Sequence, residues 1–326
     1  MLIFLFGFLG FFEPGLNYYL CEKISFLMKV LKVSKPSDYS SYLGLSDPHP
    51  LVSVIEYDRI SPVYLTLNDY GVYGIFLRGD DSVDLTYGCG RYDYKEGTLL
   101  AVAPGQLGGT EDTGEKFPLS GWALLFHPDL LQGTPLEKGI GRYTFFEYSI
   151  NEALHMTEEE KEIVTGLMRS IELEAGKPHD MQQDRIIVGY IELMLNFCQR
   201  FYDRQFAARK VENSDILGRF QEVLNGYFAA DKQLSEGIPT IQYMADRLCV
   251  SPSYLGDLIK RSTGSTASKY IQRQVVQMAK NLISSGHSIS ETAYSLGFDY
   301  PQHFSRFFKR EEGITPKDYM LRRRKN

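Results

Sequence analysis

The sequence predicts an α+β protein with an antiparallel β-barrel or sandwich, a helical segment and an all-helical C-terminal domain. Three observations predict it: short β-rich runs between Gly and Pro from Leu51 to Tyr148, helical apolar spacing after Asn151, and two similar helix-turn-helix patterns after Thr240. The 326 residues, 43% hydrophobic and 23% charged, suit a globular protein with two cores. The predicted divisions are an extension (1–27), a β-domain (28–150), a helical segment (151–206), a linker (207–215) and a helical domain (216–326).

The N-terminal extension differs in composition from the rest of the chain. It opens with twelve nearly all-apolar residues, MLIFLFGFLGFF, and Glu13 and Pro14 stop this run well short of the roughly 20 residues of a membrane span. The basic region and the small-residue cleavage site of a signal peptide are both missing. We expect translation to start at Met28, so that residues 1–27 have no structural role and the membrane is not a partner. The alternative is a membrane-surface anchor.

Charge is distributed unevenly along the chain, whose formal net charge is -6. Residues 214–326 contain 16 Lys and Arg against 11 Asp and Glu, a balance of +5, which leaves 19 against 30, a balance of -11, for residues 1–213. The basic balance therefore belongs to the helix-turn-helix region. It favours a nucleic-acid partner for that region without establishing one.

The four cysteines are far apart and include no CxxC pair, so they predict neither a zinc motif nor a disulfide framework. A reducing cytoplasm is the expected location. The histidines include no His-x-His pair, and the β-domain contains only His49 and His127. Because a three-histidine site needs more ligands than this, we expect no metal and no cofactor. His127 is interpreted as a strand-end residue bonded to the backbone.

Two stretches of the β-domain, Tyr92–Gln106 and Gly121–Leu131, resemble strands of cupin-like sensor domains. The resemblance implies a barrel whose mouth can hold a small-molecule effector of unknown identity. The candidates to line it are aromatic and basic residues, namely Tyr57, Tyr73, Arg78, Tyr87, Arg91, Tyr92, Trp122 and Phe126. The alternative is that each is an ordinary core or surface residue, because the register of the strands is not readable.

The helical segment is predicted to contain two helices. Thr157 and Glu160 form a capping-box pattern at the start of the first. The second, from about Met181 to Gln205, has apolar residues at alternating steps of four and three, the seam of a short coiled coil: Ile187, Ile191, Met194, Cys198 and Phe201. This seam is predicted to form a homodimer; the alternative is packing on the β-domain. A second apolar stripe consists of Ile186, Tyr190, Leu193 and Phe197, so we expect both contacts.

The C-terminal domain repeats one pattern twice. In Thr240–Gly264 a short amphipathic helix is followed by a turn, where Ser251 is the predicted N-cap and Pro252 the first helical residue. Ala245 is small enough to let the two helices cross closely. In Ser288–Gly313 the equivalent turn contains Gly297, whose left-handed conformation glycine allows. The aromatic residues Phe298, Phe304, Phe307 and Phe308 are predicted to fill the small core.

These motifs resemble the AraC/XylS family of transcription regulators. The residues that carry the resemblance are Ala245–Ser251, Tyr254, Leu255, Ile259–Gly264, the linker helix Tyr270–Ile283, Ile289, Ala293, Gly297–Asp299, His303–Arg310, Gly313, Thr315, Pro316 and Tyr319. The resemblance covers about Ser214–Arg324. It implies a double helix-turn-helix domain that binds double-stranded DNA, with RNA polymerase as a further partner.

The resemblance implies two sets of DNA-binding residues. The first recognition helix offers Ser253, Tyr254, Gly256, Asp257, Lys260 and Arg261, and the second offers Tyr300, Gln302, His303, Arg306 and Lys309. Arg306 suits guanine and Gln302 suits adenine, whereas Lys260, Arg261 and Lys309 suit phosphates. Asp257 either accepts from cytosine or pairs with Lys260 or Arg261. The second helix is therefore expected to read more of the sequence.

The sequence thus predicts a DNA-binding transcription regulator, not an enzyme, controlled by a small ligand in the β-domain. One alternative is a regulator without a small-molecule effector, controlled by a protein partner or by expression level. Another is a cupin-type enzyme, which the shortage of histidine ligands in the β-domain disfavours.

Overall fold

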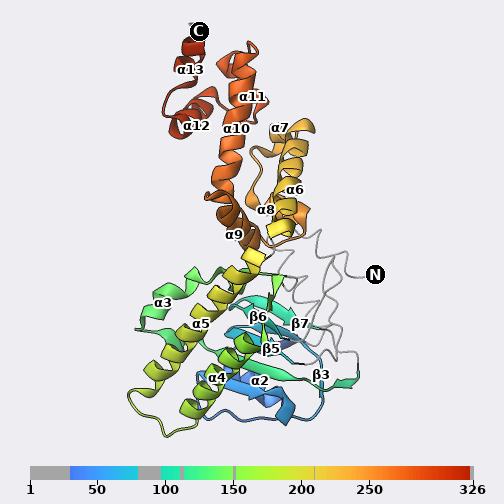
Figure 1. Ribbon diagram of the computed structural model, residues 1–326, viewed down its shortest axis with the longest axis vertical. Helices are drawn as coiled ribbons and strands as arrows, with labels where there is room; N and C mark the ends of the chain where they lie inside the picture. The colour runs from blue at the N-terminus through green and yellow to red at the C-terminus, as the bar shows by residue number, and fades with distance from the viewer. Residues whose placement is uncertain (1–29, 80–96, 111–113, 150–151, 209, 324–326) are drawn as a thin grey trace. The chain divides into compact units, whose positions relative to one another are not determined.

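The computed structural model describes residues 30–79, 97–110, 114–149, 152–208 and 210–323 (Figure 1). Two compact units divide the chain, Met1–Gln205 and Phe206–Asn326. The first unit combines strands and helices, and the second is helical in its described residues. This confirms the mixed α+β class. The predicted extension at 1–27 lies outside the described residues.

In its described residues, the first unit contains short strands interrupted by brief helices, and two long helices follow. The strands are β1 Val30–Val33, β2 Val52–Glu56, β3 Val63–Tyr64, β4 Leu67–Tyr70, β5 Tyr73–Arg78, β6 Thr98–Val102, β7 Gln106–Gly109, β8 Lys116–Phe117, β9 Gly121–Phe126 and β10 Leu154–His155. The helices are α2 Pro36–Tyr42, α3 Pro135–Gly139, α4 Glu158–Ala175 and α5 Gln183–Ala208.

The strands form three sheets rather than one closed barrel, as far as the described ranges show. A five-stranded antiparallel sheet has the order β10-β6-β5-β9-β2, a three-stranded sheet has the order β1-β4-β7, and β3 pairs with β8. The predicted antiparallel arrangement is wrong for one pair, since β1 runs parallel to β4, with Val30 opposite Leu67. The two larger sheets share one apolar core, in which Val33 and Tyr70 of one pack with Ile55 and Leu125 of the other. The described part is thus closer to a sandwich.

Strand β9 lies between β5 and β2 in the five-stranded sheet, and all six of its residues are buried. Because side chains alternate along a strand, Ala123 and Leu125 join the core between the sheets. Trp122 lies on the opposite face, where the guanidinium of Arg169 from α4 is 5.2 Å from its ring. Figure 1 shows α4 and α5 side by side across this face of the sheet.

Helix α4 begins at the predicted capping box, in which Thr157 accepts from the Glu160 amide and Glu160 accepts from the Thr157 amide. Helix α5 differs from the prediction of an exposed dimer seam. All five of its residues, Ile187, Ile191, Met194, Cys198 and Phe201, are buried within the chain. Burial raises the pKa of the Cys198 thiol to about 12. The seam therefore packs inward, and this conformation offers no part of it to a second copy.

The stripe that α5 leaves accessible is the second one. Ile186 and Leu193 are 40% and 46% exposed, and Tyr190 and Phe197 are half-buried. The sequence contains two apolar stripes on this helix. In the folded unit the seam is the buried stripe, and the adjacent residues Val188 and Leu195 are buried with it.

The second unit consists of α6 Lys210–Ala229, α7 Gln233–Glu236, α8 Ile241–Leu248, α9 Pro252–Thr263, α10 Ala267–Ser284, α11 Ile289–Ser295, α12 Pro301–Glu312 and α13 Pro316–Arg323. Helix α6 begins at Lys210, earlier than the predicted Ile216, and α5 extends to Ala208, so most of the predicted linker is helical. A single core runs through the unit from Phe220 and Leu224 to Phe304 and Phe308. In the described part of the chain, no helix is both long and apolar enough to span a membrane.

Candidate nucleic-acid interface

The first helix-turn-helix consists of α8 and α9. Thr240 caps α8 by accepting a hydrogen bond from the Tyr243 amide at 3.1 Å. The helix ends at Cys249, which adopts the left-handed conformation with φ 57°. Ser251 then accepts from the Tyr254 amide at 3.2 Å and Pro252 opens α9, which confirms the predicted cap and start. Ala245 is fully buried where the helices cross.

Helix α9 presents fewer of the predicted DNA-binding residues than expected. Lys260 and Arg261 are exposed, and Ser253, Gly256 and Asp257 are half-buried. The prediction for Tyr254 is wrong, because its side chain is only 6% exposed and its ring lies 5.0 Å from that of Phe206. The guanidinium of Arg261 lies 4.7 Å from the same Phe206 ring. Tyr254 therefore stabilises the unit rather than facing a ligand.

The second helix-turn-helix consists of α11 and α12. Ser288 and Glu291 form a capping box at the start of α11, and the bonds from Ser288 lower the pKa of Glu291. The turn contains Gly297 with φ 81°. A Cβ atom at this position would lie 2.1 Å from the carbonyl oxygen of Gln233. Glycine is therefore required both for the backbone conformation and for the close approach of α7.

The aromatic residues after this turn form the predicted core. Phe304 and Phe308 are fully buried, Phe307 is buried, and Phe298 contacts Phe304 and Phe307 with ring centroids 5.4 and 5.2 Å apart. This inward set leaves the opposite face of α12 in solvent. All five predicted residues of the second set are exposed: Tyr300, Gln302, His303, Arg306 and Lys309.

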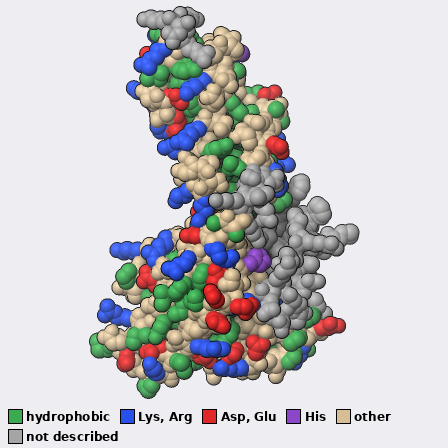
Figure 2. Space-filling view, viewed as in Figure 1, with side chains coloured by type: hydrophobic (Ala, Val, Ile, Leu, Met, Phe, Trp, Pro, Cys, Tyr) green, Lys and Arg blue, Asp and Glu red, His purple; other side chains and the backbone are tan. Residues whose placement is uncertain are grey.

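The exposed face of α12 combines hydrogen-bonding and positive groups. Tyr300 and His303 are neighbours, with ring centroids 5.4 Å apart. Arg306 lies one turn after His303, because residues three apart share a helix face. Figure 2 shows several Lys and Arg side chains on the face of the helical unit that it presents. The second set thus occupies one accessible surface, whereas the first set is split between exposed and half-buried positions.

The predicted effector-binding residues lie on different faces of the first unit. Tyr57 is in the core between the sheets, where its hydroxyl lies 2.8 Å from that of Tyr39. Burial raises the pKa of Tyr57 well above its usual value and that of Tyr39 to about 12. Tyr73 and Trp122 lie on the opposite face of the five-stranded sheet. There Tyr73 on β5 is in register with Phe126 on β9, and their rings stack with centroids 5.1 Å apart.

Three more of the predicted effector-binding residues, Tyr87, Arg91 and Tyr92, lie outside the described ranges. Arg78 is the last residue of β5 and pairs in register with Gly121 of β9. The structure adds two residues that sequence reasoning missed, Tyr39 and Tyr70, which share the inner core with Tyr57. Their signal was weak, because tyrosine is intermediate between buried and exposed residue types, so neither Tyr39 on α2 nor Tyr70 on β4 is marked as a core residue by its type alone.

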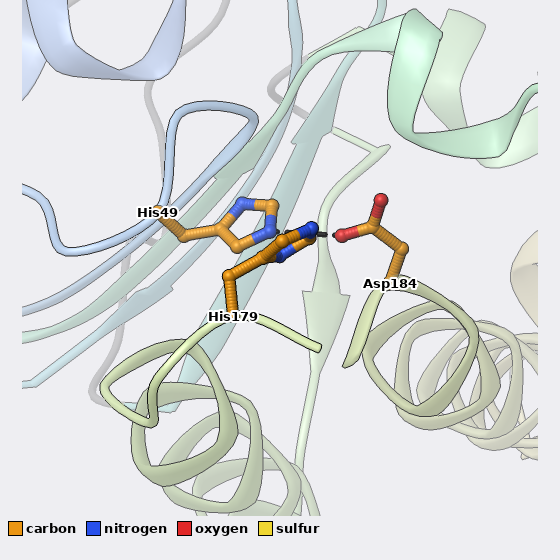
Figure 3. Close-up of side chains that lie close together, drawn as sticks. All are labelled: His49, His179 and Asp184. Atoms are coloured by element: carbon orange, nitrogen blue, oxygen red, sulfur yellow. Dashed lines mark hydrogen bonds and ion pairs between the residues drawn. The ribbon is translucent and has the colours of Figure 1, made fainter. Parts of the chain in front are cut away.

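Histidines behave partly as predicted. His127 accepts a hydrogen bond from the Asp129 amide at 3.2 Å, which confirms its interpretation as a residue bonded to the backbone. His49, however, lies close to His179 and Asp184 (Figure 3). His179 and Asp184 belong to the helical segment, so a count of the histidines in the β-domain does not include them.

A family model described as a helix-turn-helix domain matches residues 244–323. The chain contains a helix-turn-helix domain. YesN of Bacillus subtilis (strain 168), described as an uncharacterized transcriptional regulatory protein, is 40% identical over 124 residues, which cover 37% of this chain and 32% of YesN. The transcriptional activator RhaS of Salmonella arizonae is 36% identical over 76 residues, which cover 23% of this chain and 27% of RhaS. Both relatives are described as transcriptional regulators.

The chain thus spans about a third or less of the curated relatives that it matches. Among solved structures, a DNA-binding transcriptional dual regulator from Escherichia coli K-12 is 28% identical, covers 33% of this chain and 91% of its own, and has a TM-score of 0.28.

Proposed function

We propose that the protein is a sequence-specific DNA-binding transcription regulator of AraC type that acts in the cytoplasm. The observation that carries the proposal is the repeated helix-turn-helix, α8–α9 and α11–α12, separated by the 18-residue helix α10. In this arrangement the second helix of each pair enters a major groove. Recruitment of RNA polymerase belongs to the same proposal.

The two recognition helices contribute differently in this proposal. Arg306 and Gln302 on α12 are exposed and have the side chains that bond guanine and adenine in the bidentate manner. Lys260, Arg261 and Lys309 contact phosphates, which supply affinity without sequence choice. Helix α9 serves mainly to position the domain, because the half-buried Ser253, Gly256 and Asp257 offer short side chains.

The test is binding of the purified protein to DNA from upstream of its own gene, followed by fluorescence anisotropy. A fluorescent duplex of that region is compared with a shuffled duplex of equal length and composition. We expect tighter binding to the upstream duplex, with an affinity that falls linearly with salt on a logarithmic scale because counterions are released. Equal affinities for both duplexes, or no binding at low salt, would refute the proposal.

Control by a small molecule is the second part of the proposal. The core between the sheets contains Tyr39, Tyr57 and Tyr70, whose hydroxyls are polar groups in an otherwise apolar interior. Small-molecule sites in proteins combine a mostly apolar lining with a few polar groups of this kind. A ligand bound there would shift the population of chains able to bind DNA. Thermal stabilisation of the protein by members of a compound library tests this part, and a regulator without an effector would show none.

A homodimer is the third part, now assigned to the outer stripe of α5 rather than to the buried seam. Leu193 is 46% exposed at the middle of this stripe, with Tyr190 and Phe197 beside it. Leu193→Glu should convert a dimer to a monomer in sedimentation, because it places a charge in an apolar interface. Glu192→Gln, next to it on the helix, is the control that should leave the dimer intact.

A further inference from the structure

Three potential metal ligands from different parts of the first unit meet at one point. His49 precedes β2, His179 lies in the connection between α4 and α5, and Asp184 belongs to the first turn of α5 (Figure 3). One ligand atom from each residue lies within 4.8 Å of the others. Nε2 of His49 lies 2.9 Å from Oδ1 of Asp184.

The geometry points to a binding site for a divalent transition metal ion, formed by His49, His179 and Asp184. Two imidazoles and one carboxylate are a typical three-residue set for such ions, which complete their coordination with water. Mg²⁺ and Ca²⁺ prefer all-oxygen sites, so the nitrogen ligands select against them. The protein supplies a buried ligand, His49 at 3% exposure, and two accessible ones, so that an ion can enter from solvent.

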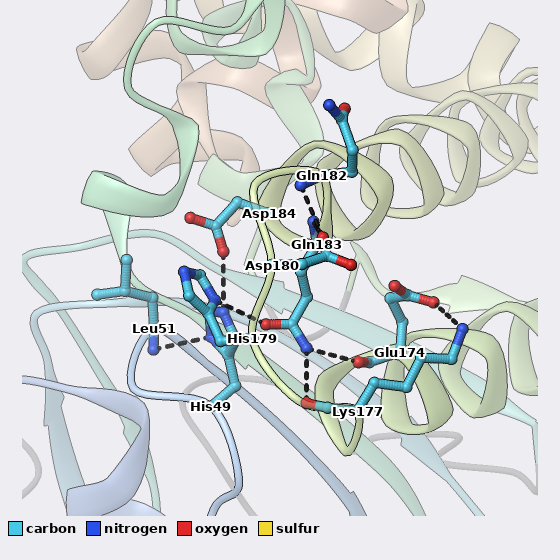
Figure 4. Close-up of polar contacts among 9 residues, drawn as sticks. All are labelled: His49, Leu51, Glu174, Lys177, His179, Asp180, Gln182, Gln183 and Asp184. Carbon is cyan, nitrogen blue, oxygen red and sulfur yellow. Dashed lines mark hydrogen bonds and ion pairs between the residues drawn. The ribbon is translucent and has the colours of Figure 1, made fainter.

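His179 is already oriented for coordination by its neighbours (Figure 4). The amide nitrogen of Gln183 donates to the carbonyl oxygens of Glu174 and Lys177, at 2.8 and 3.1 Å. Both of its hydrogens are used, so the oxygen of Gln183 is the acceptor that faces His179 Nδ1 at 2.9 Å. Nδ1 of His179 must therefore carry a proton, and the lone pair is left on Nε2. A ring nitrogen that donates to a fixed acceptor is the arrangement found behind metal-bound histidines.

The support around His179 is itself fixed by the start of α5. Gln183 is buried, and the carboxylate of Asp180 accepts from the backbone amides of Gln182 and Gln183 at 2.7 and 3.0 Å. The connection between α4 and α5 therefore has a defined shape. Asp184 follows directly on the helix and extends toward His49. Two of the three ligands thus belong to one ordered turn.

His49 needs one rearrangement on binding. Its Nδ1 accepts a hydrogen bond from the Leu51 amide at 3.2 Å, so in this state Nε2 carries the proton and donates it to Asp184. When Nε2 binds an ion, that proton moves to Nδ1, and the Leu51 amide loses its acceptor. The Leu51 amide is therefore a local reporter of occupancy. A bound ion would connect the loop before β2 to the start of α5.

The test uses the full chain, freed of metal by a chelator and then titrated with Zn²⁺ in a calorimeter. We expect a stoichiometry of about one ion per chain, a melting temperature that rises with the Zn²⁺ concentration, and no response to Mg²⁺. Hydrogen exchange at the Leu51 amide should change on addition of Zn²⁺. No binding of Zn²⁺ would overturn the proposal.

Two variants separate this site from other places where Zn²⁺ could bind. Asp184→Asn keeps an oxygen that accepts from His49 but removes the charge, and His179→Ala removes an accessible ring; each should weaken Zn²⁺ binding at least about tenfold. His127→Ala, another histidine of the same unit, should not. Co²⁺ in place of Zn²⁺ should show no thiolate charge-transfer band. Unchanged affinity in Asp184→Asn and His179→Ala, or a thiolate band, would place the ion elsewhere and overturn the proposal.

Discussion

At equivalent positions of the two helix-turn-helix units, Ala245 and Ala293 are fully buried, and each carbonyl accepts a hydrogen bond from the residue five places later. The donors are the amides of Val250 and Phe298, at 3.1 and 3.0 Å. Between them, Cys249 and Gly297 both adopt the left-handed conformation. The same backbone turn is thus made by a cysteine in one unit and by a glycine in the other.

The surroundings explain the difference. Gly297 lies against the backbone of Gln233, and the side chain of Gln233 also donates to the Ser295 carbonyl at 3.0 Å. Cys249 is exposed, so a side chain is accommodated there. The next helix differs as well, because Ser251 caps α9 with its side chain, whereas Tyr300 makes no such bond to α12. Ser251 therefore stabilises the start of α9, whereas the side chain of Tyr300 makes no cap bond and is exposed at the start of α12.

The largest expected effect is that of Gly297→Ala. The left-handed conformation and the contact with the Gln233 carbonyl should together lower the free energy of unfolding of the helical unit by roughly 3 kcal/mol. Faster hydrogen exchange in peptides from α10, measured by mass spectrometry, reports this loss. Cys249→Ala is the matched control and should change exchange little. Equal effects at both positions would show that the two turns are supported alike.

The next effect concerns binding. Arg306→Ala should weaken binding to the upstream duplex by about 1–3 kcal/mol, which is roughly fivefold to 150-fold, because it removes a bidentate contact to a base. Asp257→Ala should change affinity by no more than about twofold, since it removes no positive group. Fluorescence anisotropy at constant salt measures both. The reverse ranking would assign sequence reading to α9.

Ser251→Ala should lower the free energy of unfolding by about 1 kcal/mol, the usual value of an N-cap. Tyr300→Ala should leave this free energy nearly unchanged, because Tyr300 is 57% exposed and makes no side-chain cap bond. Its effect is expected on DNA affinity instead. Hydrogen exchange in α9 and α12 peptides separates the two results, and a stability loss in Tyr300→Ala would contradict this contrast.

The smallest effect is expected for Gly256→Ala. A Cβ atom at this mid-helix position meets only Ile241 Cδ1 at 3.6 Å, an ordinary contact. Alanine should therefore raise the free energy of unfolding by about 0.5–1 kcal/mol by restricting the unfolded chain. Slower exchange in α9 would show it. An unchanged DNA affinity in the same variant would support a positioning role for α9, whereas a large loss would mean that the helix approaches DNA too closely for a methyl group.

The helical unit was largely predictable because its signals are local. Ser251, Pro252 and Gly297 mark caps and turns within a few residues of the helices that they limit. The burial of Tyr254 could not be predicted from the sequence, because it depends on a contact with Phe206, which is far away in the chain. The sequence likewise shows both stripes of α5, and only packing on the sheets decides that Ile187 lies inside and Ile186 outside.

The first unit was less predictable for the same reason. Parallel pairing of β1 with β4 joins strands that are distant in the chain, and no short pattern specifies it. His49 and Asp184 are 135 residues apart and come from regions that composition assigns to different parts of the protein. Histidine spacing along the sequence indicates only sites made by residues close together in the chain, so it does not predict a cluster that the fold assembles.

The contact between Gly297 and Gln233 affects how the domain can be isolated. A fragment begun at Met244, where the match to the family model starts, would lack the start of α8 and also the carbonyl that supports the second turn. It would also lack Phe220 and Leu224, which fill the core beside α10. The smallest fragment expected to fold therefore begins near the start of α6, so the folding domain is longer than the recognition motif.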